Sequence, residues 1–235
     1  MRGLRLHGDR DLRLDSLPDP APPGPGEVLL RIRAVALNHI DVWGHRGMAF
    51  AQRNLPLVVG AEAVGEVVAV GAGVTAWAPG DRAAPYGALT CGHCRACTSG
   101  QDNLCENVRG VMGFHLDGFC RDFVTMPERL LVRVPDQLSW DDAACGAITF
   151  STVEHMLFDN AKLEPGETIL VHAAGSGIGT VAIRMAKAIG CTVIATAGSD
   201  EKCARALDLG ADHVVNYTTK NFSTTARRVT GKRGV

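Results

Sequence analysis

Short stretches in which apolar and polar residues alternate dominate the first half of the chain. In EVLLRIRAVAL, apolar and basic residues alternate through Leu30-Arg31-Ile32-Arg33, which is the period of a half-buried antiparallel strand. The stretches VGEVVAVGAGV, GFCRDFVTMP and LLVRVP predict further strands, with glycines suited to tight bends or bulges. Many short strands separated by Gly and Pro turns predict a compact, barrel-like β-domain over residues 1–132.

The pattern changes after residue 132. SWDDAACGAITFSTVEHMLF predicts a helix with Ser139 as its N-cap and acidic residues in its first turn. ETILVHAAGSGIGTVAIRMAKAIG then predicts an apolar strand, a glycine-rich turn and an amphipathic helix. CTVIATAG, SDEKCARALDLG and ADHVVNY predict another strand, helix and strand. This alternation indicates a parallel sheet with crossover helices over residues 133–235, so the expected fold class is α/β plus β.

Composition and charge narrow the kind of protein. Of its 235 residues, 46% are hydrophobic and 21% are charged, which is the balance of an ordinary globular protein. The 24 basic and 25 acidic residues give a net charge of -1, which disfavours nucleic acid or an acidic membrane as a partner. The sequence shows no signal-peptide core and no stretch long enough to span a bilayer, which predicts a cytoplasmic protein with free thiols.

Four of the eight cysteines lie in one short loop, CGHCRACTSGQDNLC. In a cytoplasmic protein this density favours a metal site over disulfide bonds, and the remaining cysteines are expected to be free thiols. The density alone leaves open whether the metal performs chemistry or only holds the loop together. The predicted ligands are Cys91, Cys94, Cys97 and Cys105.

A glycine-rich turn, AAGSGIG, joins the first predicted parallel strand to its helix. Glycine permits a sharp turn and close approach to a pyrophosphate, and the following helix offers unpaired N–H groups. The turn is not a strict G-x-G-x-x-G because position 180 is Thr, but its place between strand and helix predicts dinucleotide binding. The residues expected to contact the cofactor are Gly175, Ser176, Gly177, Ile178 and Gly179.

The end of the second parallel strand bears on the choice of cofactor. An NAD enzyme usually places Asp or Glu there to bind the ribose hydroxyls, whereas this strand ends in Thr-Ala-Gly. Ser199, Lys202 and Tyr217 could instead meet a 2′-phosphate, which favours NADP(H), with NAD(H) as the alternative. The competing interpretation is that Ser199 only caps a helix and Lys202 is a solvated surface residue.

Together, these features resemble the medium-chain dehydrogenase/reductase superfamily, and within it the zinc-binding quinone oxidoreductase-like branch. The resemblance covers essentially the whole chain, through VALNHIDVWGHRG, VVGAEAVGEVVAVG, PGDR, the cysteine loop, VHAAGSGIG and ATAGSDEK…LGADHVVNY. It implies a GroES-like β-domain followed by an incomplete Rossmann domain, with hydride transfer to or from a nicotinamide cofactor. It also implies one structural zinc, because four thiolates leave no ligand position for water or substrate.

The same resemblance draws attention to the positions of a second, catalytic zinc. In the family's alcohol dehydrogenases this ion is held by a Cys in the segment matching ALNHID, a His in the segment matching VGAEA, and a later Cys or acid. Here the first two positions are Asn38 and Ala61, and only Cys145, with Glu62 nearby, could still serve. Two ligands are fewer than the three that catalytic zinc sites use, and the histidines of NHIDVWGH are weaker substitutes.

Loss of the catalytic zinc favours a substrate whose developing charge spreads into an enolate, such as a quinone or an α,β-unsaturated carbonyl. By analogy, Asn38 would donate to the carbonyl oxygen, Asp41 would orient its loop and Thr149 would lie near the nicotinamide, although structural hydrogen bonding is an alternative role for each. The expected function is therefore an NADPH-dependent reductase of small-molecule carbonyls, enones or quinones. The alternatives are a zinc alcohol dehydrogenase with atypical ligands and a truncated, non-catalytic binder of nucleotide or a partner protein.

The sequence stops soon after the third predicted parallel strand. Relatives in the family continue into further Rossmann strands, so the sequence predicts either a fragment or a partner that covers the apolar edge of TILVH. The resemblance also implies a homo-oligomer.

Overall fold

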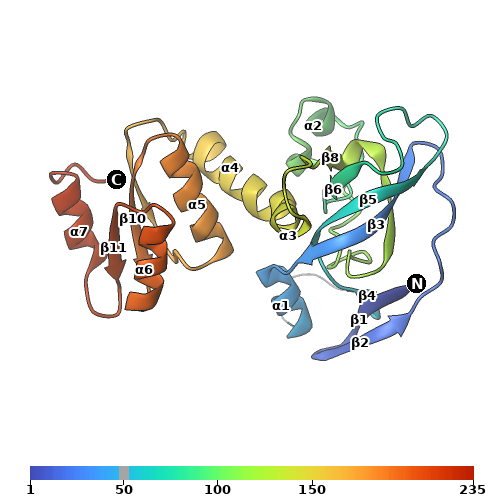
Figure 1. Cartoon of the computed structure of the whole chain (residues 1–235), viewed down its shortest axis with the longest axis horizontal. Coiled ribbons are helices and arrows are strands. Elements are labelled where there is room, and N and C mark those ends of the chain that lie inside the picture. Colours follow the sequence, from blue (N-terminus) through green and yellow to red (C-terminus); the bar gives the residue numbers. More distant parts are fainter. Residues whose placement is uncertain (48–52) are drawn as a thin grey trace. The chain divides into compact units, whose positions relative to one another are not determined.

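The computed structural model describes residues 1–47 and 53–235, which form two compact units, Met1–Ile148 and Thr149–Val235 (Figure 1). The first unit consists mainly of antiparallel β-structure and the second of a parallel sheet with helices, which confirms the predicted fold class. In the described ranges, no helix combines the length and the apolar character needed to cross a membrane.

Two antiparallel sheets make up the first unit, with strand orders β2-β1-β4 and β7-β3-β5-β6-β8. The strands are β1 (Arg2–Gly8), β2 (Asp11–Ser16), β3 (Glu27–Ala36), β4 (Leu57–Val58), β5 (Glu62–Val70), β6 (Arg82–Pro85), β7 (Phe123–Pro127) and β8 (Leu131–Arg133). The helices are α1 (His39–His45), α2 (Arg95–Thr98), α3 (Trp140–Ala144) and the short 3₁₀ helices η1 (Asp102–Leu104) and η2 (Glu128–Leu130).

Strand β3 is the strand that the alternating pattern predicted most directly. Leu30 is fully buried and Arg31 is exposed, as a period of two requires. The strand pairs with β5 and β7, and two register shifts against β5 mark bulges. At the second shift, a Cβ on Gly65 would lie 2.6 Å from the carbonyl oxygen of Arg31, so this bulge requires glycine.

Helix α3 belongs to the first unit although it follows the last strand of the β-structure. It packs against β3 and β5, where Ala143 and Ala144 join a buried cluster with Val64 and Ala84. The compact units therefore divide between residues 148 and 149, later in the chain than the predicted boundary between residues 132 and 133.

The second unit has a three-stranded parallel sheet in the order β11-β10-β9. The strands are β9 (Thr168–Val171), β10 (Thr192–Ala197) and β11 (His213–Asn216). The helices are the π-helix η3 (Gly146–Phe150), which begins in the first unit, then α4 (Ser151–Glu154), the π-helix η4 (His155–Asn160), α5 (Gly177–Ala188), α6 (Asp200–Asp208) and α7 (Phe222–Val229). Strands and helices alternate as predicted, and the core contains fully buried Ile183, Val193 and Ala195.

Serine side chains cap the N-termini of three helices. Ser139, Ser176 and Ser199 accept hydrogen bonds from backbone N–H groups three residues ahead, at 3.0, 3.0 and 3.3 Å. These N-caps satisfy donors that a helix leaves unpaired, and they fix where α3, α5 and α6 start. The last two stand at the carboxyl ends of β9 and β10, where a ligand of a parallel sheet usually binds.

Candidate functional site

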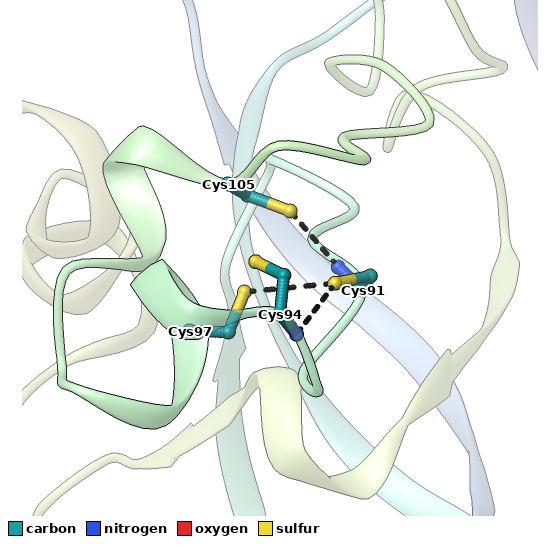
Figure 2. A group of neighbouring side chains, drawn as sticks. All are labelled: Cys91, Cys94, Cys97 and Cys105. Carbon is teal, nitrogen blue, oxygen red and sulfur yellow. Dashed lines mark hydrogen bonds between the residues drawn. The ribbon is translucent and has the colours of Figure 1, made fainter.

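Four thiols converge in the loop between β6 and β7, as the sequence predicted. The sulfur atoms of Cys91, Cys94, Cys97 and Cys105 all lie within 4.8 Å of one another, and Figure 2 shows them directed toward a common space. The sulfurs of Cys91 and Cys97 are 3.9 Å apart. A tetrahedral zinc with Zn–S bonds of about 2.3 Å separates its sulfurs by about 3.8 Å. The four thiols therefore fit one zinc ion in a closed site.

Backbone N–H groups donate to two of these sulfurs and so stabilise their thiolate form. The N–H groups of Cys94 and Cys91 donate to the sulfurs of Cys91 and Cys105, each at 3.3 Å. The N–H of His93 lowers the pKa of the Cys91 thiol to about 6, whereas burial raises the pKa of Cys97 to about 12. Opposed pKa shifts are expected where thiols share one space, because the first thiolate disfavours the next until a cation binds.

Arg129, from η2, contacts the start of the cysteine loop and was not predicted. Its guanidinium donates to the carbonyl oxygen of Thr90 and, at 3.2 Å, to the hydroxyl of the same residue. A Cβ on Gly92 would lie 2.8 Å from Nε of Arg129, so the close approach depends on glycine. Arg129 thus brings positive charge to a loop of thiols and ties that loop to η2. In the sequence it is one arginine among many, without a motif.

An amide–carboxylate pair, formed by the partly buried Asn38 and the buried Glu62, lies in the segments to which the family resemblance assigns the catalytic zinc ligands. Glu62 opens β5 and is 0% exposed. Nδ2 of Asn38 donates to its Oε2 at 2.8 Å, and the backbone N–H of Ile148 donates to its Oε1 at 2.5 Å. Because a carboxylate only accepts, the amide must present its nitrogen to Glu62. The second N–H of Asn38 has no acceptor within the described ranges, so it can serve a ligand.

Asp41 holds the backbone on both sides of this pair. Its carboxylate accepts the N–H of Asn38 at 2.8 Å and the N–H of Gly60 at 3.1 Å. Burial raises the pKa of this carboxyl above its ordinary value, although the two N–H donors act in the opposite direction. These contacts suit the predicted role in orienting the loop rather than direct contact with a substrate.

The other positions of the predicted second metal site offer few ligand atoms for a metal ion. Ala61 is buried and carries no donor atom. Cys145 is exposed at the end of α3, and partial desolvation of its thiol, together with the charge of Glu62, raises its pKa. Neither this cysteine nor His39 or His45 belongs to any group of three or more potential ligands within reach of one metal, as far as the described residues extend. Metal binding by Cys145 and Glu62 stays a prediction.

The glycine-rich turn lies between β9 and α5, and its residues have distinct roles. The hydroxyl of Ser176 accepts the N–H of Gly179. A Cβ on Gly179 would lie 2.4 Å from the carbonyl oxygen of Ala173, so glycine is needed for α5 to begin this close to β9. Within the described ranges, the N–H groups of Gly177 and Ile178 have no acceptor. Such donors at a helix N-terminus are what a pyrophosphate requires.

Of the residues predicted to select the cofactor, Lys202 lies beside this turn, and Ser199 and Tyr217 lie where the chain leaves β10. A Cβ on Gly175 would lie 3.7 Å from Cδ of Lys202, so the lysine stem lies beside the glycine turn. A Cβ on Gly198 would lie 2.7 Å from the hydroxyl of Tyr217, which is 56% exposed. Lys202 forms no ion pair with any described residue. Ser199 caps α6, as the competing interpretation held, and this contact does not prevent its hydroxyl from donating to a phosphate.

Thr149, the third predicted catalytic residue, lies in the second unit and is 9% exposed. Its methyl carbon is 3.6 Å from the place that a Cβ on Gly177 would take. The structure thus puts Thr149 beside the glycine-rich turn, and the contact of Thr149 with a nicotinamide stays a prediction.

Comparison with known families covers both units. The family described as alcohol dehydrogenase GroES-like domain matches residues 24–136, and the family described as zinc-binding dehydrogenase matches residues 177–235. The first match contains the cysteine loop and the amide–carboxylate pair, and the second begins inside the glycine-rich turn, at Gly177.

Individual relatives agree with these matches. An alcohol dehydrogenase of Geobacillus stearothermophilus is 40% identical over 81% of this chain and 56% of its own length. A quinone oxidoreductase of Pseudomonas aeruginosa is 35% identical over 89% of this chain and 55% of its own length. The crystal structure of an NAD-dependent alcohol dehydrogenase is 43% identical, with a TM-score of 0.93 over 100% of this chain and 69% of that one. The chain therefore spans between about half and two thirds of the length of these relatives.

Proposed function

The chain belongs to the medium-chain dehydrogenase/reductase superfamily. We propose that it functions as an NADPH-dependent reductase of quinones or α,β-unsaturated carbonyls and uses no catalytic zinc. The observation that carries this proposal is the amide–carboxylate pair. Where the family's alcohol dehydrogenases have Cys and His ligands, this chain has an amide and a methyl group, and a buried carboxylate fixes the amide.

The pair suits the chemistry of a conjugated substrate. A bound nicotinamide cofactor supplies a hydride. When hydride reaches the β-carbon, the electrons of the C=C bond move onto the carbonyl oxygen, and a proton from solvent later reaches the α-carbon. The remaining N–H of Asn38 would donate to this oxygen as its charge develops, in the manner of an oxyanion hole. An isolated ketone concentrates the charge on an alkoxide, for which one amide N–H is a poor replacement for a metal ion.

The second unit supplies the groups that would hold the cofactor. The free N–H groups of Gly177 and Ile178 suit the pyrophosphate, and Ser199, Lys202 and Tyr217 suit a 2′-phosphate. No carboxylate ends β10, which supports NADP(H). NAD(H) is the alternative, since one similar structure is an NAD-dependent enzyme. The four cysteines would hold one structural zinc.

A zinc-dependent alcohol dehydrogenase is the second candidate. It is favoured by the alcohol dehydrogenase relative and by the nearness of Cys145 to Glu62, whose charge affects the pKa of the thiol. Under either candidate the substrate is a small molecule, and a cytoplasmic homo-oligomer remains our prediction.

Turnover distinguishes the two candidates. We expect the protein purified from its own cells to oxidise NADPH with cyclohexenone or a benzoquinone and to leave cyclohexanone unchanged. Asn38→Ala should lower kcat/KM for the enone by about 100-fold, because one donor to the oxyanion is lost. Asn107→Ala, an exposed asparagine outside the site, is the matched control and should change nothing. Oxidation of simple alcohols with inhibition by a zinc chelator would refute the reductase and support the dehydrogenase.

A further inference from the structure

A contact between the end of strand β11 and the start of helix α6 bears on cofactor selection, and the inference drawn from it rests on the proposed function. Asn216 ends β11, and its register partner Ala197 ends β10. The two strands thus stop side by side. In a doubly wound sheet, the ribose of a dinucleotide lies at this rim.

Asp200, at the start of α6, brings a carboxylate to this rim. Nδ2 of Asn216 donates to Oδ1 of Asp200 at 2.8 Å. On its other side, the amide oxygen of Asn216 accepts the N–H and the hydroxyl of Thr218, at 3.1 and 2.6 Å. The amide is therefore held from both sides, and its orientation is fixed with the nitrogen toward the carboxylate.

Two lysines lie close along the chain to the residues of this contact: Lys202 in α6, and Lys220, whose backbone N–H donates to the carbonyl oxygen of Asn216. The aliphatic part of the Lys202 side chain lies beside the glycine-rich turn, and Lys220 lines a hollow of about 380 Å³ that Tyr217 also lines. Neither lysine has an ion-pair partner within the described ranges. A 2′-phosphate, which carries nearly two negative charges, would be attracted to these lysines and repelled by the carboxylate of Asp200 if that group turned toward it; the hydrogen bond from Asn216 leaves the charge of Asp200 in place and fixes its position.

We propose that Asn216 is a positioning residue for cofactor specificity. By engaging the carboxylate of Asp200 at the end of β11, it keeps that group from taking the role that an acidic residue plays on the ribose in NAD enzymes. Lys202 and Tyr217 then form the site for the 2′-phosphate. The preference for a 2′-phosphate depends on a residue that itself need not touch the cofactor.

Two nucleotide fragments test this directly, because they differ only in the 2′-phosphate. Titration calorimetry of the purified chain with 2′,5′-ADP and with 5′-AMP should show tighter binding of 2′,5′-ADP. Asn216→Leu keeps the branched shape of the side chain and its number of heavy atoms, and it removes the hydrogen bonds. It should lower the preference for 2′,5′-ADP by about tenfold, through weaker binding of that nucleotide alone.

A second substitution separates charge from fold. Adding Asp200→Asn to Asn216→Leu should restore the preference, because no carboxylate is left to repel the phosphate. A purely structural role of Asn216 would not be rescued in this way.

The possible failures are distinct. If the original chain binds neither fragment, or prefers 5′-AMP, the NADPH part of the proposed function is wrong and the inference fails with it. If the chain prefers 2′,5′-ADP and Asn216→Leu retains that preference, the inference alone is overturned. It is also overturned if Asp200→Asn gives no rescue.

Discussion

Two regions of the first unit gather side chains that could hold a metal, and they are built on different physics. The cysteine loop, residues 91–105, brings four thiols within 4.8 Å of one another. The amide–carboxylate pair has one buried carboxylate whose oxygens accept two N–H donors, with a single exposed thiol in the vicinity. The first arrangement gathers like groups that need a cation, whereas the second is already satisfied by hydrogen bonds.

The burial of the two regions explains the difference. Within the cysteine loop only Cys94 is buried, so this loop has almost no core of its own. Glu62 lies at the start of β5, which is buried along most of its first half. A loop without a core depends on an ion for its order, and a carboxylate within a core depends on having all its partners. In one domain, therefore, the cysteine loop keeps a full set of metal ligands, whereas the positions of the family's catalytic zinc carry a hydrogen-bonded pair instead.

The largest effect is expected from breaking the cysteine loop. Cys97→Ser should remove the zinc and lower Tm by about 10 °C or more, because structural zinc sites contribute many kcal/mol to folding. Zinc content by mass spectrometry and thermal unfolding measure the two effects. Cys145→Ser, the exposed thiol near Glu62, is the control and should keep both the zinc and Tm. Equal zinc content in Cys97→Ser and the original chain would mean that the four thiols are not the ligands.

A smaller effect is expected from the carboxylate of the pair. Glu62→Gln offers one acceptor to two donors, so one N–H must face an NH₂ group, at a cost of about 1–3 kcal/mol. Glu66→Gln on the same strand is the control. Glu66 faces solvent with Arg33, and its loss should cost less than about 1 kcal/mol. Urea unfolding compares the two variants, and equal losses would show that the buried pair has no special role in stability.

The smallest effect concerns pH and Asp41. Burial raises the pKa of this carboxyl, so the ionised form is disfavoured in the folded state. The resulting contribution to stability is fully present below the unfolded pKa of about 3.9 and is lost as pH rises through the higher folded pKa. The free energy of unfolding, measured relative to the Asp41→Asn variant, should therefore rise as pH falls from 7 toward 4. A relative stability that falls on acidification would mean that the two N–H donors outweigh burial.

The sequence was sufficient where a feature is local. Alternation in EVLLRIRAVAL predicted β3, serines before acidic residues predicted helix caps, and cysteine spacing predicted the thiol group. Contacts between distant residues could not be predicted in this way. The hydrogen bond from Ile148 to Glu62 spans 86 positions, and neither residue carries a pattern that reveals it. The packing of α3 on β3 and the approach of Arg129 to Gly92 are missed for the same reason.

Zinc content of the purified, intact chain tests the central claim most directly. If the cysteine loop is the one metal site, mass spectrometry under native conditions should find about one zinc per chain, unchanged by Cys145→Ser and abolished by Cys97→Ser. A content of about two zinc ions per chain, falling to about one in Cys145→Ser, would contradict the claim that the amide–carboxylate pair has replaced a catalytic metal.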